Sequence, residues 1–295
     1  MLNIESTLRD LGARYWPLVK GWQTGLLLLT ALAGYLGAAQ ASGQWPALFG
    51  LIGSLFLAIS GGTVLNMGFD RDIDAQMART CRRPLVTGQV SPGAAWRLGV
   101  VLSVLGLAWA LVLSPLTAAL VAAGLFFEIV VYTVWLKRRT AWSILLGGVA
   151  GAMPILTGWA LATGGVDRIG LLLAVAVLFW VPTHNLTLSM RHLGDYRRAG
   201  VPTFPLVYGR RATHGLITFS GALAALAMST AFVWIGLPAP IVWTSVMLGA
   251  GLICFALMAW IRPSEGETTV LFKYASLYML SSMLLLAVGG LGMPV

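Results

Sequence analysis

The chain has 295 residues, of which 58% are hydrophobic and only 10% are charged, and its mean hydropathy is +0.84. Soluble domains carry about 25% charged residues, so this composition excludes a soluble globular protein and a disordered chain. The long, continuous apolar runs also exclude a membrane β-barrel, whose strands alternate polar and apolar residues. We therefore expect an all-α polytopic membrane protein. The net charge of +9 then indicates basic loops on one membrane face rather than a nucleic-acid partner.

The spans can be placed in chain order. Residues 1–19 mix charged and apolar side chains and predict an amphipathic segment at the membrane interface. A spanning helix needs about 20 mostly apolar residues. Nine stretches meet this requirement, near 20–41, 46–66, 94–113, 116–136, 141–162, 169–189, 214–236, 239–262 and 270–292. We expect one transmembrane domain over residues 1–295, with two long loops at 67–93 and 190–213.

The basic residues set the expected orientation. With nine spans and a cytoplasmic N-terminus, every Lys and Arg except Arg168 lies in a cytoplasmic segment or at the cytoplasmic end of a span. Such an excess is typical of the cytoplasmic side of a membrane. We expect a multi-pass protein of the cell inner (plasma) membrane, whose two long loops open to the cytoplasm.

The scarce carboxylates cluster where the first long loop begins. Asn66, Asp70 and Asp74 are spaced by four residues, which places them on one face of a helix, whereas Asp72 points elsewhere. Like charges at this spacing repel each other and need a compensating cation. Oxygen ligands without a nearby Cys suit Mg²⁺, which is usually held by one or two carboxylates together with substrate phosphates. The alternative is that these carboxylates only pair with arginines of the same loop.

The second long loop repeats the first. The pattern Pro-Leu-Val-x-Gly occurs at 84–88 and again at 205–209, and the same offset of 121 residues carries Asp74 onto Asp195. Both segments follow a predicted span, and those spans are four helices apart. We therefore expect a duplicated four-helix unit with a ninth helix added. Its two acidic loops would flank one central cavity and hold one polyanionic ligand.

Three further residues carry open alternatives. Glu128 lies within a predicted span, where an ionisable group is either functional or hydrogen-bonded as a neutral group to a neighbouring helix. His184, in the sixth span, is either a structural hydrogen-bonding residue or a ligand contact. Arg191 takes the place of Asp70 under the 121-residue offset, and it either pairs with Asp195 or contacts the anion. Arg138 and Arg139 are interpreted as topology or lipid-headgroup residues.

Five segments carry a resemblance to a known family. They are Asn-Met-Gly-Phe-Asp-Arg-Asp-Ile-Asp at 66–74 with Arg79-Thr80 and Arg83-Pro84-Leu85 after it, Tyr-Thr-Val-Trp-Leu-Lys-Arg-Arg-Thr at 132–140, Gly-Gly-Val-Ala-Gly-Ala-Met-Pro at 147–154, Trp180, Pro182 and His184 in the sixth span, and Asp-Tyr-Arg-Arg-Ala-Gly-Val-Pro at 195–202. Together they resemble the UbiA-type intramembrane prenyltransferases. The stretch at 132–140 favours the heme branch of that family, the protoheme IX farnesyltransferases. The similarity covers residues 15–211 approximately.

The resemblance implies nine transmembrane helices around a central cavity, and transfer of a prenyl group from a diphosphate to an acceptor, with Mg²⁺ and the diphosphate held by two Asp-rich motifs. In the heme branch, farnesyl diphosphate alkylates a vinyl group of protoheme IX and water is then added, which gives heme O. The site residues expected are Asn66, Asp70, Asp74 and Asp195 for the metal, Lys20, Arg79, Arg83 and Lys137 for the diphosphate, and His184 and Asn185 for the acceptor. Asp70, Asp74 and Asp195 are the expected catalytic carboxylates.

The chain departs from the heme branch where the second motif and the acceptor pocket should meet. Gly194 stands in place of the first of two paired Asp residues, and Asn185-Leu186 stands in place of Phe-Trp after the His. The alternatives are therefore an aromatic, quinone-precursor or other lipophilic acceptor, or cyclisation of the prenyl chain. A transporter or heme-handling protein without catalysis is the alternative from another class, and the two equivalent acidic loops argue against it.

Overall fold

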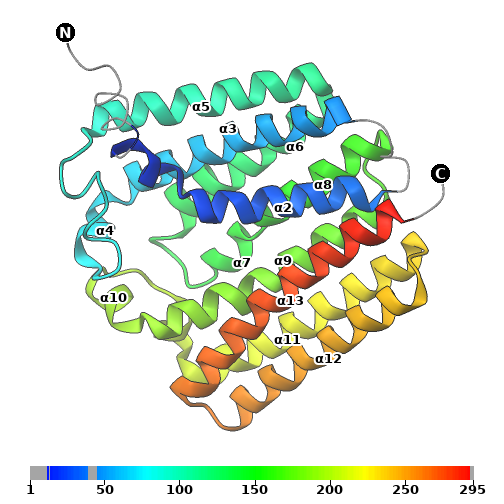
Figure 1. The fold of residues 1–295 in the computed structure, drawn as a ribbon. Helices are drawn as coiled ribbons and strands as arrows, with labels where there is room; N and C mark the ends of the chain where they lie inside the picture. Colours follow the sequence, from blue (N-terminus) through cyan, green and yellow to red (C-terminus); the bar gives the residue numbers. More distant parts are fainter. Residues whose placement is uncertain (1–11, 13, 39–44, 293–295) are drawn as a thin grey trace.

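The computed structural model describes residues 12, 14–38 and 45–292, and over this range it contains helices and no strand (Figure 1). Eight helices or joined helix pairs are long and apolar enough to cross a membrane. They are α3 (Trp45–Phe69), α5 (Pro92–Leu113), α6 (Pro115–Leu125) continued by the π-helical segment η3 (Phe126–Leu136), α7 (Ser143–Gly147) continued by α8 (Val149–Thr163), α9 (Arg168–Arg191), α11 (Phe204–Ile235), α12 (Ala239–Ile261) and α13 (Glu265–Leu291). The prediction of an all-α polytopic membrane protein is confirmed.

The first predicted span corresponds to α2 (Gly21–Gly37), whose 17 residues lie at the lower limit of what can cross a bilayer. A short 3₁₀ turn, η1 (Trp16–Val19), precedes it. Most of the predicted interfacial segment at 1–19 lies outside the described residues.

The second long loop contains more helix than the sequence predicted. It holds α10 (Leu193–Arg198), and α11 begins at Phe204 although its span was predicted to start at 214. Pro205 occupies the first turn of α11, where a missing backbone N–H costs no hydrogen bond. The helix then breaks at Gly209, whose φ of 78° and ψ of 171° are not helical. The first loop likewise contains a short helix, α4 (Arg71–Gln76).

The helix bounds repeat at the offset of 121 residues. This offset carries α3 onto residues 166–190, close to the bounds of α9, and α4 onto residues 192–197, close to those of α10. Gly88 and Gly209, the equivalent glycines of the two Pro-Leu-Val-x-Gly segments, have φ of 77° and 78°. A positive φ of this size favours glycine over any other residue. The matching backbone supports the duplication expected from the sequence.

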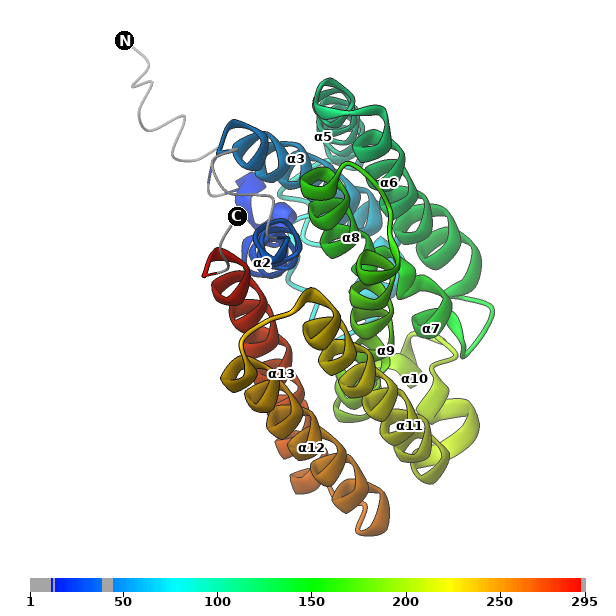
Figure 2. The same cartoon turned by 90° about the vertical axis from the view of Figure 1, so that its right-hand side faces the viewer.

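Close contact between α2 and α8 holds the two parts of the bundle together. A Cβ on Gly34 would lie 2.2 Å from the Ile155 carbonyl oxygen, and one on Gly158 would lie 2.0 Å from that of Ala31. Only glycine permits this approach of two helix backbones. These two helices contact α3 and α6 on one side and α9 and α13 on the other (Figure 2).

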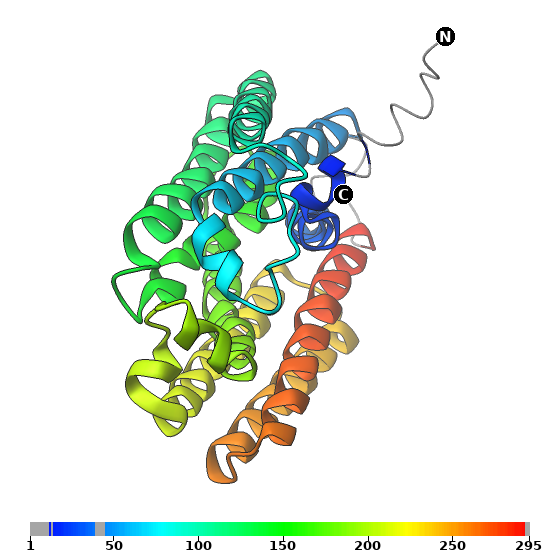
Figure 3. The same cartoon turned by 90° about the vertical axis from the view of Figure 1, so that its left-hand side faces the viewer.

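The two acidic segments lie at the same end of the bundle, where α4 and α10 are neighbours (Figures 1 and 3). A small apolar cluster joins them. Ile73 and Met77 from the first loop are buried against Val201 from the second, and Tyr196 packs on this cluster. The two loops are therefore held together by apolar contacts that do not depend on any ligand.

The glycine contact gives a test of the packing. We expect Gly34→Ala to lower the melting temperature of the purified protein in detergent, because the added methyl group forces α2 and α8 apart. Gly25→Ala, in the same helix, is the matched control, since nothing lies within 4 Å of a Cβ at that position. Equal melting temperatures for the two variants would contradict this account of the contact.

Candidate functional site

The site begins where α3 meets α4. Asp70 has φ of −92° and ψ of 8°, which interrupts the helix between Phe69 and Arg71. The Asp70 amide still donates to the Asn66 carbonyl at 2.9 Å, and the Asp74 amide donates to the Asp70 carbonyl at 2.8 Å. Because this i to i−4 bonding continues through the interruption, the spacing of four residues does bring Asn66 and Asp70 together.

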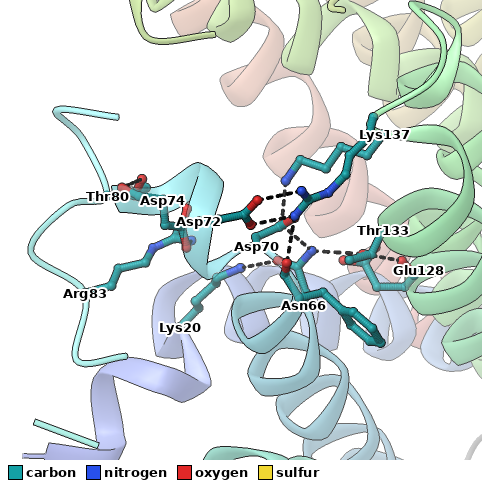
Figure 4. A network of polar contacts seen from close by, with 12 residues as sticks. Lys20, Asn66, Asp70, Asp72, Asp74, Thr80, Arg83, Glu128, Thr133 and Lys137 are labelled. Atoms are coloured by element: carbon teal, nitrogen blue, oxygen red, sulfur yellow. Dashed lines mark hydrogen bonds and ion pairs between the residues drawn. The ribbon is translucent and has the colours of Figure 1, made fainter. Parts of the chain in front are cut away.

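Asn66 is the centre of a buried polar network (Figure 4). Its amide nitrogen donates to Asp70 Oδ2 at 3.0 Å and to Thr133 Oγ1 at 2.9 Å. Its Oδ1 accepts from Lys20 Nζ at 3.3 Å. The Thr133 hydroxyl donates in turn to the Glu128 carbonyl oxygen at 2.7 Å, within η3. A π-helical turn is rare and often marks a functional site, and here it presents Thr133 to Asn66.

Asp70 is almost completely buried, at 1% exposure, and Lys137 compensates its charge. Lys137 Nζ lies 2.5 Å from Asp70 Oδ2. The other oxygen, Oδ1, is buried and has no hydrogen-bond partner within the described part of the chain. A buried carboxylate oxygen without a donor is unfavourable. This oxygen is therefore free to accept a cation.

Asp74 is also buried, and it pairs within its own loop. Arg83 Nη1 lies 2.6 Å from Asp74 Oδ2, and the Thr80 hydroxyl donates to the Asp74 carbonyl oxygen at 3.1 Å. Asp74 therefore pairs with an arginine of its own loop, as the alternative interpretation expected. Asp70 instead pairs with Lys137, which follows η3.

Asp72 points away from this network, as its position between the spaced residues predicted. Arg138 Nη1 and Nη2 each lie 2.6 Å from one of its carboxylate oxygens. The hydrogen bonds to Arg138 are the main reason that the pKa of Asp72 falls to about 2. The interpretation of Arg138 as a topology residue is therefore incomplete.

Lys20 reaches the network from an unusual backbone. Its φ of 48° and ψ of 53° lie in the left-handed region, which costs a non-glycine residue about 1–2 kcal/mol. Burial, followed by the charge of Arg83, lowers the pKa of Lys20 to about 8. Lys137 acts in the same direction, whereas Glu128 and Asp74 raise this pKa. Crowded ammonium and guanidinium groups of this kind favour the binding of an anion.

The second loop contributes Asp195, which is buried and pairs with Arg198 of the same helix, α10. Arg79, from the first loop, is exposed and forms no ion pair with any described carboxylate. It lies near His192, since burial and then Arg79 lower the pKa of His192 while Asp195 raises it. Arg79 therefore lies within electrostatic range of His192 in the second loop.

The two residues expected at the acceptor, His184 and Asn185, lie in α9 and outside the polar network. No hydrogen bond among the described residues links them to Asn66. The His184 ring stacks between Trp180, at 4.9 Å, and Phe272, at 4.8 Å, and its Nδ1 lies 3.3 Å from the Ser276 hydroxyl. His184 and Asn185 are both half-buried.

Arg191 does not pair with Asp195, and its guanidinium carbon lies 5.0 Å from the Phe272 ring centroid. Glu128 lies close enough to Lys20, Lys137 and Asp70 for electrostatic interaction. It therefore stands beside the polar network and keeps its place as a functional candidate.

The donor atoms fit one hard cation completed by a ligand. The described residues contain no group of three or more Asp, Glu, His or Cys side chains that could hold a metal alone. Mg²⁺ does not need such a cage, because it usually takes one or two carboxylates and completes its shell with water and phosphate oxygens. The unpartnered Oδ1 of Asp70 supplies an anchor of this kind.

Sequence reasoning missed three members of the site, Thr133, Arg138 and Arg198. Thr133 and Arg138 contact partners 67 and 66 residues away. Arg198 follows Asp195 by three residues, a helical ion-pair spacing, so its role could have been found from the sequence.

The chain is similar to known proteins over most of its length. The model of the UbiA prenyltransferase family matches residues 27–286. A protoheme IX farnesyltransferase of Korarchaeum cryptofilum is 38% identical over 259 residues, which cover 88% of this chain and 87% of that protein. One of Cereibacter sphaeroides is 40% identical over 275 residues, covering 90% and 86%.

Solved structures share the fold at low sequence identity. A digeranylgeranylglyceryl phosphate synthase superposes with a TM-score of 0.81 at 18% identity, covering 97% of this chain and 100% of that chain. A UbiA homologue of Archaeoglobus fulgidus bound to DMAPP and Mg²⁺ superposes with a TM-score of 0.68 at 17% identity, covering 93% and 99%.

The buried ion pair predicts an asymmetric effect on stability. Lys137→Met leaves the Asp70 carboxylate buried without its cation, which costs about 3–5 kcal/mol for a buried pair. The double variant Asp70→Asn/Lys137→Met removes both charges, and we expect it to recover most of the melting temperature in detergent. Arg139→Met is the control, because Arg139 is exposed. A double variant less stable than Lys137→Met would contradict the pairing.

Proposed function

Because this chain belongs to the UbiA prenyltransferase family, and is therefore an intramembrane prenyltransferase, we propose that it transfers a farnesyl group from farnesyl diphosphate to a vinyl group of protoheme IX. The product is heme O, and the reaction depends on Mg²⁺. The names of the relatives at 38% and 40% identity support this acceptor. One observation carries the proposed binding of the diphosphate donor. Asn66 and Asp70 are buried side by side, and each binds an ammonium group, that of Lys20 and that of Lys137 respectively.

The proposed donor step is cleavage of the bond between C1 of the prenyl chain and the diphosphate oxygen. Its barrier lies in the negative charge that develops on the leaving diphosphate, and fixed cations aimed at that charge lower it. Lys20, Lys137, Arg83 and Arg79 supply these cations. Arg83 has to exchange Asp74 for the diphosphate, while Arg79 is available without breaking an ion pair among the described residues.

Asn66, Asp70 and Asp74, with Asp195 from the second loop, would hold Mg²⁺. The bound metal supplies Lewis-acid stabilisation of the diphosphate. The unpartnered oxygen of Asp70 supports this assignment. The metal of the Archaeoglobus fulgidus homologue, bound together with DMAPP, supports it further.

In the acceptor step, the electron pair of the vinyl double bond forms a bond to C1 of the farnesyl chain. Water adds to the carbon left positive and then loses a proton, which gives the hydroxyl group. We assign acceptor contact to His184 and Asn185, whose side chains in α9 are half-buried.

The surroundings of the site follow from the same proposal. The chain is a multi-pass membrane protein, and we propose that its N-terminus and both acidic loops face the cytoplasm, where a water-soluble diphosphate head group arrives. We also propose that residues 1–295 act as one transmembrane domain, in line with the family match over 27–286.

Loss of one carboxylate tests the donor site. We expect Asp70→Asn to lower kcat by about 100-fold or more, because it removes a group that acts on the developing charge. Glu267→Gln is the control, since Glu267 is half-buried in the first turn of α13 and has no hydrogen bond or ion pair with the described residues of the network. Wild-type turnover by Asp70→Asn would remove this residue from the mechanism.

The acceptor is tested directly with purified protein, farnesyl diphosphate and Mg²⁺. We expect reduced protoheme IX to give a product whose mass has gained one farnesyl group and one hydroxyl group, detected by mass spectrometry. A product formed only with an aromatic quinone precursor would replace the acceptor and keep the donor site. Omission of Mg²⁺ with added chelator is expected to abolish either product.

A further inference from the structure

Two consecutive basic residues bind two carboxylates across the same gap. Lys137 pairs with Asp70, and Arg138 pairs with Asp72. The cations are neighbours after η3, and the carboxylates lie two residues apart at the junction of α3 with α4. The inner pair is buried, with side-chain exposures of 14% for Lys137 and 2% for Asp70. The outer pair is open to solvent, with 42% for Arg138 and 62% for Asp72.

The outer pair has the geometry of a clamp. Both terminal nitrogens of Arg138 bind the Asp72 carboxylate at 2.6 Å, the two-bond arrangement that fixes orientation as well as distance. Arg138 Nη2 also donates to the carbonyl oxygen of Phe69, the last residue of α3, at 2.8 Å. Arg138 therefore binds the junction on both sides of Asp70, at Phe69 and at Asp72.

The inner pair has to change partners when the donor binds. Under the proposed function, on which this inference rests, Asp70 turns to the metal and Lys137 turns to the diphosphate. Asp72 does not have to change partners, because it is exposed to solvent. Arg138 is its ion-pair partner within the described part of the chain. The outer pair can therefore stay closed while the inner pair opens.

We infer that Arg138 and Asp72 are positioning residues, which keep the Lys137 ammonium at the diphosphate site while its ion pair with Asp70 opens. A short tether of this kind raises the effective concentration of a group at its target. Asp72 is then an anchor for the clamp and takes no part in binding the metal. Loss of the clamp weakens donor binding more than it slows the chemical step.

The test measures binding of an unreactive donor analogue, farnesyl S-thiolodiphosphate, to the full-length protein in detergent with Mg²⁺, by isothermal titration. Arg138→Ala and Asp72→Ala are each expected to raise Kd about 3- to 10-fold, with kcat for farnesyl diphosphate changed by less than about two-fold. Arg139→Ala is the matched control, since it removes the same charge from the next position, which is also exposed. We expect this variant to keep the wild-type Kd.

A charge-reversed pair separates positioning from general loss of charge. Asp72→Arg/Arg138→Asp is expected to bind the analogue within about two-fold of wild type. Arg138→Lys, which keeps the charge but cannot form both bonds, should lie between wild type and Arg138→Ala. Melting temperatures recorded for each variant identify any that is misfolded.

Two results would overturn the inference. One is an equal Kd for Arg138→Ala and Arg139→Ala. The other is a charge-reversed variant that binds no better than the single variants. If the wild-type protein itself fails to bind the analogue, the proposed function is rejected instead, and the two failures are therefore distinguishable.

Discussion

Burial of the Asp70 carboxylate is the constraint that organises this end of the bundle. A carboxylate at 1% exposure is tolerated only where cations and hydrogen-bond donors replace the water it has lost. Lys137 and Asn66 do so for one of its oxygens. Asn66 is in turn oriented by Lys20 from one side and Thr133 from the other. Three segments distant in the sequence therefore converge because one charge has been removed from solvent.

The cations of the site are crowded together, and this crowding explains why the site is suited to an anion. Burial is the main reason that the pKa of Lys20 is low, and repulsion from Arg83 and Lys137 adds to it. A polyanion relieves this repulsion when it binds. The strained backbone of Lys20 is consistent with a residue held in place for binding rather than for stability.

The sequence predicted those parts of the site that follow from local periodicity. The contact between Asn66 and Asp70 was predictable because i to i−4 bonding persists through the break at Asp70. The pairing of Asp70 with Lys137 and of Asp72 with Arg138 could not be predicted from periodicity. These partners lie 67 and 66 residues apart, and no periodic pattern indicates a contact over that distance in the sequence. The π-helical turn of η3 was equally hidden, because a continuous apolar run looks the same at 3.6 residues per turn and at a wider pitch. The early start of α11 was missed because Gly209 and the arginines after it were interpreted as loop.

The matched left-handed glycines, Gly88 and Gly209, have a consequence for symmetry. A repeat that contains an even number of spans enters and leaves the membrane on the same side, so its copy is inserted in the same direction. The two halves are then related by an axis along the membrane normal, unlike the inverted halves of many transporters. Inverted halves present equivalent surfaces to opposite sides and can exchange them. Parallel halves place their equivalent loops on the same side, which accounts for the position of both acidic loops at one end of the bundle.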